Sequence, residues 1–230
     1  FSQWIIEDNF PLGRPNWDSA GAIFTNDVGP FEKMKLRMLN GTHSMLAYTG
    51  FHCGHKYVRD VMNDKILYSL VERHLLTAAQ TLKPIKGIDY LNYGKSLISR
   101  FLNPEIAHET FQIAMDGTEK MQQRIFYPLK DAISLSLDTR PFAFATAAWL
   151  RHVSKSYHDC PPYELLDPLA QKLNIFPKDI TAYSIISYLS RIGLLTDGLQ
   201  DAEIFWGQVS SILNNMMSKP MKQVVEEELV

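Results

Sequence analysis

The sequence predicts a mainly α, multi-helical protein. Apolar residues recur at helical spacing in several long segments, and helix-ending dipeptides punctuate the pattern. The predicted helices cover residues 66–82, 90–102, 105–134, 141–155, 178–195 and 200–217. The helix-ending dipeptides include Asn103-Pro104, Asp116-Gly117, Pro161-Pro162 and Lys219-Pro220.

The two ends of the chain differ from this pattern. Residues 1–30 are rich in Pro and Gly, with one β-like run at QWIIED (3–8), so we expect an irregular interdomain segment followed by a helical domain over 31–230. The sequence KPMKQVVEEELV (219–230) predicts a solvated terminal helix, with docking on another domain as the alternative. The first residues resemble neither a natural N-terminus nor a signal peptide, so we expect this sequence to be a piece of a longer chain.

Composition excludes several classes of function. With 23 basic and 25 acidic residues, the net charge of −2 provides no field for binding nucleic acid or a membrane surface. No apolar run approaches the ~20 residues that a membrane span requires. The two cysteines, Cys53 and Cys160, are too few for a disulfide framework, which favours a reducing, cytoplasmic location.

Nucleotide-binding motifs are absent from the sequence. It contains no G-x-G-x-x-G and no phosphate loop of the G-x-x-x-x-G-K-[ST] type. If the chain takes part in nucleotide chemistry, another segment must bind the nucleotide.

The stretch KMKLRMLNGTH (33–43) carries unusual polar residues within a helical pattern. Gly29-Pro30 predicts the helix start, with Glu32 in the first turn. At about 100° per residue, Glu32, Asn40 and His43 fall within about 140° of Lys35, so all four share one sector of the helix.

Gly41 lies within the same stretch. A glycine inside a helix costs about 1 kcal/mol relative to alanine, so it predicts a close approach to the backbone at that point.

This set of side chains suits proton removal from an alcohol without a metal. A partly desolvated Lys35 can serve as general base, because burial lowers the pKa of an amine. Asn40 and His43 can donate hydrogen bonds to the alcohol or ketone oxygen, and Glu32 can relay the proton to solvent. The alternative is structural: alternating cations at 33–37 are typical of a solvated helix face.

A metal site at FHCGH (51–55) is a weaker hypothesis. His52 and Cys53 are adjacent and point in different directions, and a fourth ligand is missing. We therefore predict no metal.

K-x-x-x-x-N-x-x-H, within MKLRMLNGTHS, resembles the motif of the polyol-specific long-chain dehydrogenases, the mannitol dehydrogenase family. FSQWIIEDNFPLGRPNW is similar to the segment that follows the cofactor domain of that family. NPEIAHETFQIAMDGTEKMQQRI resembles its fructuronate reductase (D-mannonate oxidoreductase) branch, and AAWLRHV and DPLA also fit. The resemblance spans roughly residues 1 to 215. These motifs occupy residues 1–17, 103–125, 147–153 and 167–170.

The resemblance implies the C-terminal substrate domain of a two-domain dehydrogenase, similar to the C-terminal domain of 6-phosphogluconate dehydrogenase, without its Rossmann domain. It implies an NAD-dependent, zinc-free oxidoreductase that acts on a polyol or sugar acid. Lys35 would be the base, and Asn40 and His43 would polarise the oxygen. The N-terminal domain would hold the NAD, so the fragment alone is expected to be inactive.

Specificity within the family stays open. D-mannonate/D-fructuronate is the leading substrate pair, and mannitol 2-dehydrogenase or arabinitol 4-dehydrogenase is the alternative. Arg37 and Arg151 could hold a substrate carboxylate, although Arg37 could instead pair with an acidic residue of a neighbouring helix. The 154–162 loop departs from the family, and for Lys120 we favour a structural role. From a different class, a non-catalytic helical interaction module is the competing reading.

Overall fold

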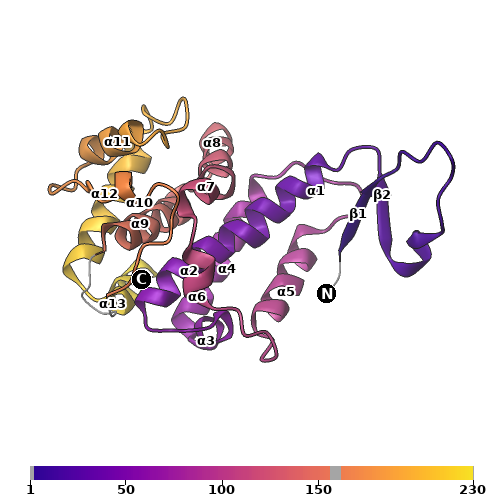
Figure 1. Cartoon of the computed structure of the whole chain (residues 1–230), viewed down its shortest axis with the longest axis horizontal. Helices are drawn as coiled ribbons and strands as arrows, with labels where there is room; N and C mark the ends of the chain where they lie inside the picture. Colours follow the sequence, from indigo (N-terminus) through magenta and orange to yellow (C-terminus); the bar gives the residue numbers. More distant parts are fainter. Residues whose placement is uncertain (1–2, 156–161, 230) are drawn as a thin grey trace.

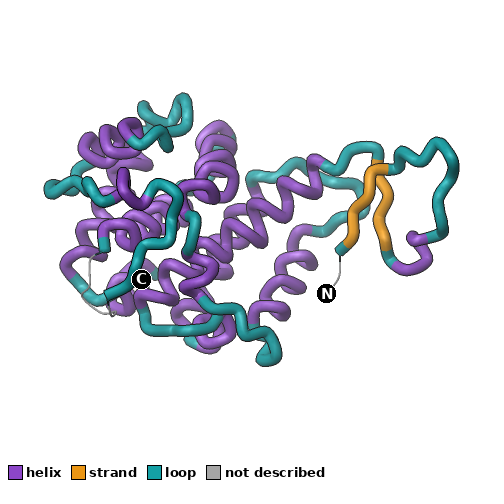
Figure 2. The backbone as a smooth tube through the Cα atoms, viewed as in Figure 1, coloured by secondary structure: helices purple, strands orange, loops and turns teal. Residues whose placement is uncertain are grey.

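The protein is a helical body with a small β extension (Figures 1 and 2). The computed structural model describes residues 3–155 and 162–229. In chain order, its elements are β1 (Trp4–Glu7), η1 (Trp17–Ala20), β2 (Ala22–Thr25), α1 (Gly29–Met34), η2 (Lys35–Gly41), α2 (Thr42–His52), α3 (Val58–Asn63), α4 (Lys65–Gln80), α5 (Tyr90–Phe101), α6 (Thr110–Ala114), α7 (Gly117–Met121), η3 (Gln122–Phe126), α8 (Tyr127–Ser134), α9 (Arg140–Ser154), α10 (Ala170–Leu173), α11 (Ala182–Arg191), α12 (Glu203–Ser218) and α13 (Met221–Glu228).

Two helices, α2 and α9, form the centre of the body. Almost every residue of α9 is buried, as expected for a helix that is apolar all round. Helix α9 packs against α12 and α2, and α2 also packs against α6. Aromatic side chains fill this core, with Trp149 and Phe142 of α9 fully buried beside Tyr48 of α2.

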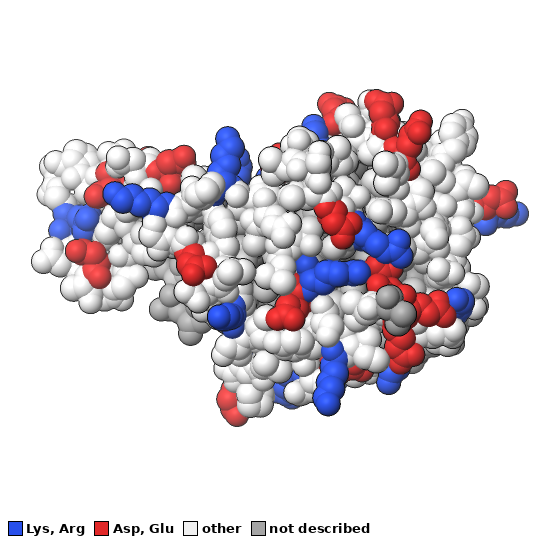
Figure 3. All heavy atoms as spheres, turned by 180° about the vertical axis from the view of Figure 1, so that it is seen from behind, with Lys and Arg blue, Asp and Glu red and all other residues white. Residues whose placement is uncertain are grey.

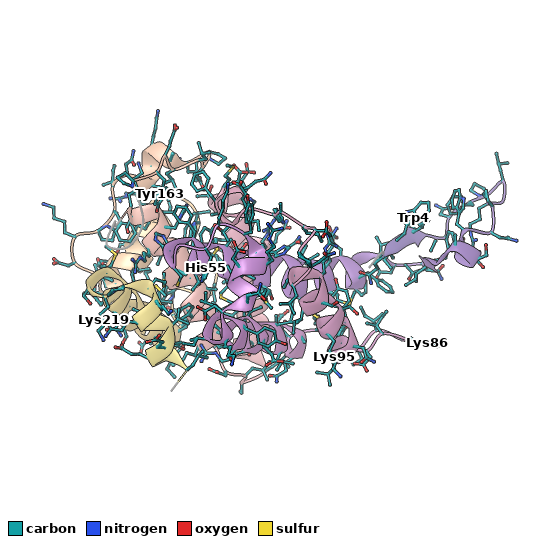
Figure 4. The ribbon with its side chains drawn as sticks, turned by 90° about the horizontal axis from the view of Figure 1, so that it is seen from below. Trp4, His55, Lys86, Lys95, Tyr163 and Lys219 are labelled. Atoms are coloured by element: carbon teal, nitrogen blue, oxygen red, sulfur yellow. The ribbon has the colours of Figure 1, made fainter. Side chains whose placement is uncertain are left out.

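Strands β1 and β2 extend away from the helical body, as the position of Trp4 in Figure 4 shows. They pair in parallel, with Trp4 opposite Ala22. Between them, Trp17 stacks on Phe24 at 6.4 Å between ring centroids and lies 5.6 Å from Trp4. Since a two-stranded sheet is marginal alone, this aromatic cluster supplies the packing that holds the extension together.

The predicted helices agree well with the structure where one apolar face runs unbroken. Helices α4, α5 and α9 match the predicted segments within two residues at each end. The segment predicted over 105–134 is not one continuous helix. It begins only at Thr110, and it breaks at Asp116, which has a left-handed φ of 53° and belongs to the predicted helix-ending dipeptide Asp116-Gly117. Strand β2 is also missing from the prediction, since its four residues lie among turn residues.

The C-terminal tail is docked rather than solvated, so that expectation is wrong. Met221, Val224 and Val225 of α13 are buried, and α13 packs against α4 and α12. The side chain of Glu228 is only 3% exposed and accepts from Arg73 and Arg140, each at 2.7 Å.

Figure 3 shows acidic and basic side chains interspersed over one face of the molecule. Among the described residues, no helix combines the length and apolarity needed to cross a bilayer.

Replacing Glu228 with Gln tests how the tail is held. The variant leaves two guanidinium groups without their shared carboxylate, so we expect the free energy of unfolding to fall by about 1–3 kcal/mol. Glu226→Gln, on the exposed side of the same helix, is the control and should change it by less than about 0.5 kcal/mol. Equal effects in urea unfolding would show that the ion pairs do not anchor α13.

Candidate active site

The predicted site residues lie on one continuous helical rod formed by α1, η2 and α2. The backbone stays helical through both junctions, at Met34 and Gly41. The middle segment, η2, is a π-helix, in which hydrogen bonds run from residue i to i+5. Residues five apart therefore come onto one face, which aligns Lys35 with Asn40 more closely than the regular helical spacing predicts.

Exposure changes along this face. Glu32 and Lys35 are exposed, whereas Asn40 and His43 are partly buried. The described chain therefore does not supply the desolvation of Lys35 that the sequence analysis expects.

His43 lies at the inner end of the face, among aromatic rings. Its ring centroid is 4.4 Å from Phe101 and 5.6 Å from His108. Burial, followed by the nearby His108, Arg100 and Arg124, lowers the pKa of His43 to about 3. His43 is consequently a neutral imidazole at ordinary pH, with one N–H donor and one acceptor nitrogen.

The close approach predicted for Gly41 is present, and it comes from another segment of the chain. A Cβ at Gly41 would lie 2.7 Å from the carbonyl oxygen of Arg124, in the π-helix η3. This contact brings the Arg124 side chain over the rod. Its Nη1 lies 3.1 Å from Ser44 Oγ and 3.5 Å from Asn40 O.

Lys120 stands one turn before Arg124. Its Nζ donates to the carbonyl groups of Ile113 and Met115 and lies 3.9 Å from Asp116 Oδ2. Burial and then the neighbouring Arg124 lower the pKa of Lys120. The carbonyl contacts are what a structural lysine would make, as the sequence analysis favours.

The turn before Lys120 is fixed by two other motifs. Thr118 donates from its N–H and its hydroxyl to the carboxylate of Asp167, at 2.9 and 2.7 Å. A Cβ at Gly117 would lie 2.4 Å from Trp149 Nε1, so only glycine fits there. The segments 103–125, 147–153 and 167–170, singled out in the sequence, therefore meet at this turn.

Arg37 and Arg151 lie apart from the His43 cluster. Arg37 is buried, donates to Thr81 and forms an ion pair with Asp131 of α8 at 2.6 Å. This is the structural alternative considered for Arg37. Arg151 is fully buried and donates to the Met216 carbonyl of α12. These contacts argue against the substrate role expected for both arginines.

Sequence reasoning missed Arg100, His108 and Arg124 as neighbours of His43. The available signal was the long motif at 103–125, which includes two of them. Part of the 154–162 loop, with Cys160, lies outside the described residues. In the described ranges, no group of three or more His, Cys, Asp or Glu side chains could hold a metal ion.

Lys35, Asn40 and His43 thus follow one another along a single helical rod of a mainly helical domain. Residues 27–217 match the family described as the mannitol dehydrogenase C-terminal domain. The chain belongs to this family, and the Rossmann domain is absent from its 230 residues.

Known relatives include enzymes of two substrate types. The chain is 36% identical to D-mannonate oxidoreductase of Escherichia coli, covering 98% of this chain and 47% of that protein. It is 32% identical to mannitol 2-dehydrogenase of Neosartorya fischeri, covering 94% and 44%. The chain thus spans about half the length of the curated relatives it matches.

A solved structure has the same fold. The ternary complex of Pseudomonas fluorescens mannitol 2-dehydrogenase with NAD and D-mannitol superposes with a TM-score of 0.89 at 27% identity, over 100% of this chain and 46% of that one. The expected fold class is confirmed.

Gly41→Ala tests the contact between η2 and η3. Alanine normally stabilises a helix, but here its Cβ would meet a backbone carbonyl, so we expect the free energy of unfolding to fall by about 1–3 kcal/mol. Gly207 in α12 is the control, because a Cβ added there would have no atom within 4 Å. Gly207→Ala should therefore raise the free energy of unfolding by up to about 1 kcal/mol. If both variants stabilise the protein in thermal unfolding, the close packing at Gly41 is wrong.

Proposed function

We propose that the full-length protein is an NAD-dependent, metal-independent oxidoreductase that interconverts D-mannonate and D-fructuronate. Membership of the family supports the reaction class. The observation that carries the assignment is the rod itself, because its π-helical turn aligns the amine of Lys35 with the amide of Asn40, one turn before the imidazole of His43. These are an acid–base group and two hydrogen-bond donors.

Each residue has a chemical role in this proposal. The uncharged amine of Lys35 takes the hydroxyl proton as the carbon–oxygen double bond forms, and the exposed Glu32 passes it to solvent. Asn40 and the neutral His43 donate to the same oxygen, where the loss of one such donor costs about 2.7–4 kcal/mol. When bound, the nicotinamide supplies the hydride acceptor. In reduction, Lys35 returns the proton.

The cofactor is proposed to bind mainly to an N-terminal Rossmann domain. The exposure of Lys35 and Glu32 leaves room beside the rod for a nicotinamide carried by such a domain. The family match begins at residue 27, which supports an interdomain segment over 1–30 and a helical substrate domain over 31–230. Closure of the two domains would then desolvate Lys35.

Lys35→Ala in the full-length protein tests the catalytic assignment. Loss of the base should lower kcat by about 10²–10⁴-fold without change in the unfolding temperature. Lys33→Ala removes another exposed lysine two residues away and should leave kcat unchanged. Unaltered turnover by Lys35→Ala would instead favour a non-catalytic helical interaction module.

A substrate panel separates the branches of the family. We expect NAD-dependent oxidation of hexonates, D-mannonate foremost, to exceed that of mannitol and arabinitol in kcat/KM. The 36% identity to D-mannonate oxidoreductase, against 32% to mannitol 2-dehydrogenase, favours this order. Oxidation of uncharged polyols alone would identify a mannitol 2-dehydrogenase or arabinitol 4-dehydrogenase.

A further inference from the structure

Arg124 is a partly buried cation whose charge is not paired within the described part of the chain. Among the described residues, its side chain donates only from Nη1, to Ser44 Oγ and Asn40 O. Among the described residues, no carboxylate forms an ion pair with it. A partly desolvated guanidinium is costly unless an anion compensates it. Arg37, by contrast, has its own aspartate at 2.6 Å.

The unused edge of Arg124 can reach a ligand. Nε and Nη2 donate to no described group, yet neither is among the fully buried polar atoms that lack a partner. This pair of parallel N–H groups is the edge that grips a carboxylate with two hydrogen bonds. The Arg124 guanidinium lies against Asn40 and Ser44, which are close to His43 on the rod. One small ligand can therefore contact both this edge of Arg124 and the proposed reaction centre.

A second cation without an ion pair among the described residues, Arg100, lies near His43. Arg100 is exposed, forms no ion pair with a described residue, and directly precedes Phe101, whose ring is 4.4 Å from His43. Arg100 and Arg124 both lower the pKa of His43, and Arg100 also lowers that of His108, so their charges act on the same small region. Neither arginine forms an ion pair within the part of the chain that the structure describes, so both charges are available to an anionic ligand.

We infer that Arg124, assisted by Arg100, forms the subsite for the carboxylate of an open-chain sugar acid, in place of Arg37 and Arg151. The inference rests on the proposed function and specifies how that site selects an anionic substrate. The fork of Arg124 binds both carboxylate oxygens, and Arg100 adds charge from the solvent side. The imidazoles of His43 and His108, 5.6 Å apart between ring centroids, lie in the same region and can donate to hydroxyl groups.

Binding measured without turnover tests this subsite independently of the chemistry. In the full-length protein carrying Lys35→Ala, with NAD present, calorimetry gives the Kd of D-mannonate and of D-mannitol, its uncharged counterpart. Adding Arg124→Gln should weaken D-mannonate binding by about 10- to 100-fold and change mannitol binding by less than 3-fold. Lys178→Gln, a distant exposed lysine, should change neither.

Two further variants guard against a structural effect at Arg124. Arg124→Lys keeps the charge but loses the fork, so it should retain an intermediate affinity for D-mannonate. Arg100→Gln removes an exposed side chain that forms no hydrogen bond or ion pair with a described residue, and it should weaken binding of D-mannonate alone, by about 3- to 10-fold. Equal weakening of both ligands, or no weakening by either Gln variant, would overturn the subsite.

The remaining outcomes separate the two proposals. If mannitol 1-phosphate binds more tightly than D-mannonate and loses that affinity in Arg124→Gln, the subsite holds a phosphate and the carboxylate assignment is wrong. Retained turnover by Lys35→Ala overturns the proposed catalytic role of Lys35 but leaves the binding comparison at Arg124 intact.

Discussion

The contact between the two π-helical segments at Gly41 is the constraint on which the site depends. Because Gly41 has no side chain, η2 and η3 can approach each other closely. A Cβ added at Gly41 would lie only 2.7 Å from the carbonyl oxygen of Arg124. Asn40, which precedes Gly41, and Arg124 are 84 residues apart in the sequence. π-Helical turns are rare and occur frequently at functional sites, and here both segments that meet at Gly41 are π-helical.

The helix that precedes η3, α7, is fixed to the core of the protein. Asp167 binds the Thr118 backbone and hydroxyl, and Gly117 lies against Trp149, so the start of α7 cannot shift without disturbing the central helix α9. Because α7 runs directly into η3, the position of Arg124 is fixed by the same packing. The site is thus rigid on its inner side and open at Lys35.

Sequence periodicity accounts for the long helices, because burial of one face determines α4, α5 and α9 locally. It fails between residues 105 and 134, where the left-handed Asp116 and the tertiary contacts of Gly117 override helical spacing. Within the site, the motif identifies Lys35, Asn40 and His43 as neighbours on one helix. It cannot reveal that Arg151 is buried against α12 or that Arg124 arrives from η3, since both depend on contacts distant in sequence.

The central claim is that three side chains of one helical rod gather around a single alcohol oxygen. A crystal structure of the full-length protein with NAD and D-mannonate tests it most directly. The account predicts Lys35 Nζ, Asn40 Nδ2 and one His43 ring nitrogen within about 3.2 Å of the oxygen at the oxidised carbon. An oxygen held by other groups, with Lys35 still facing solvent, would contradict it.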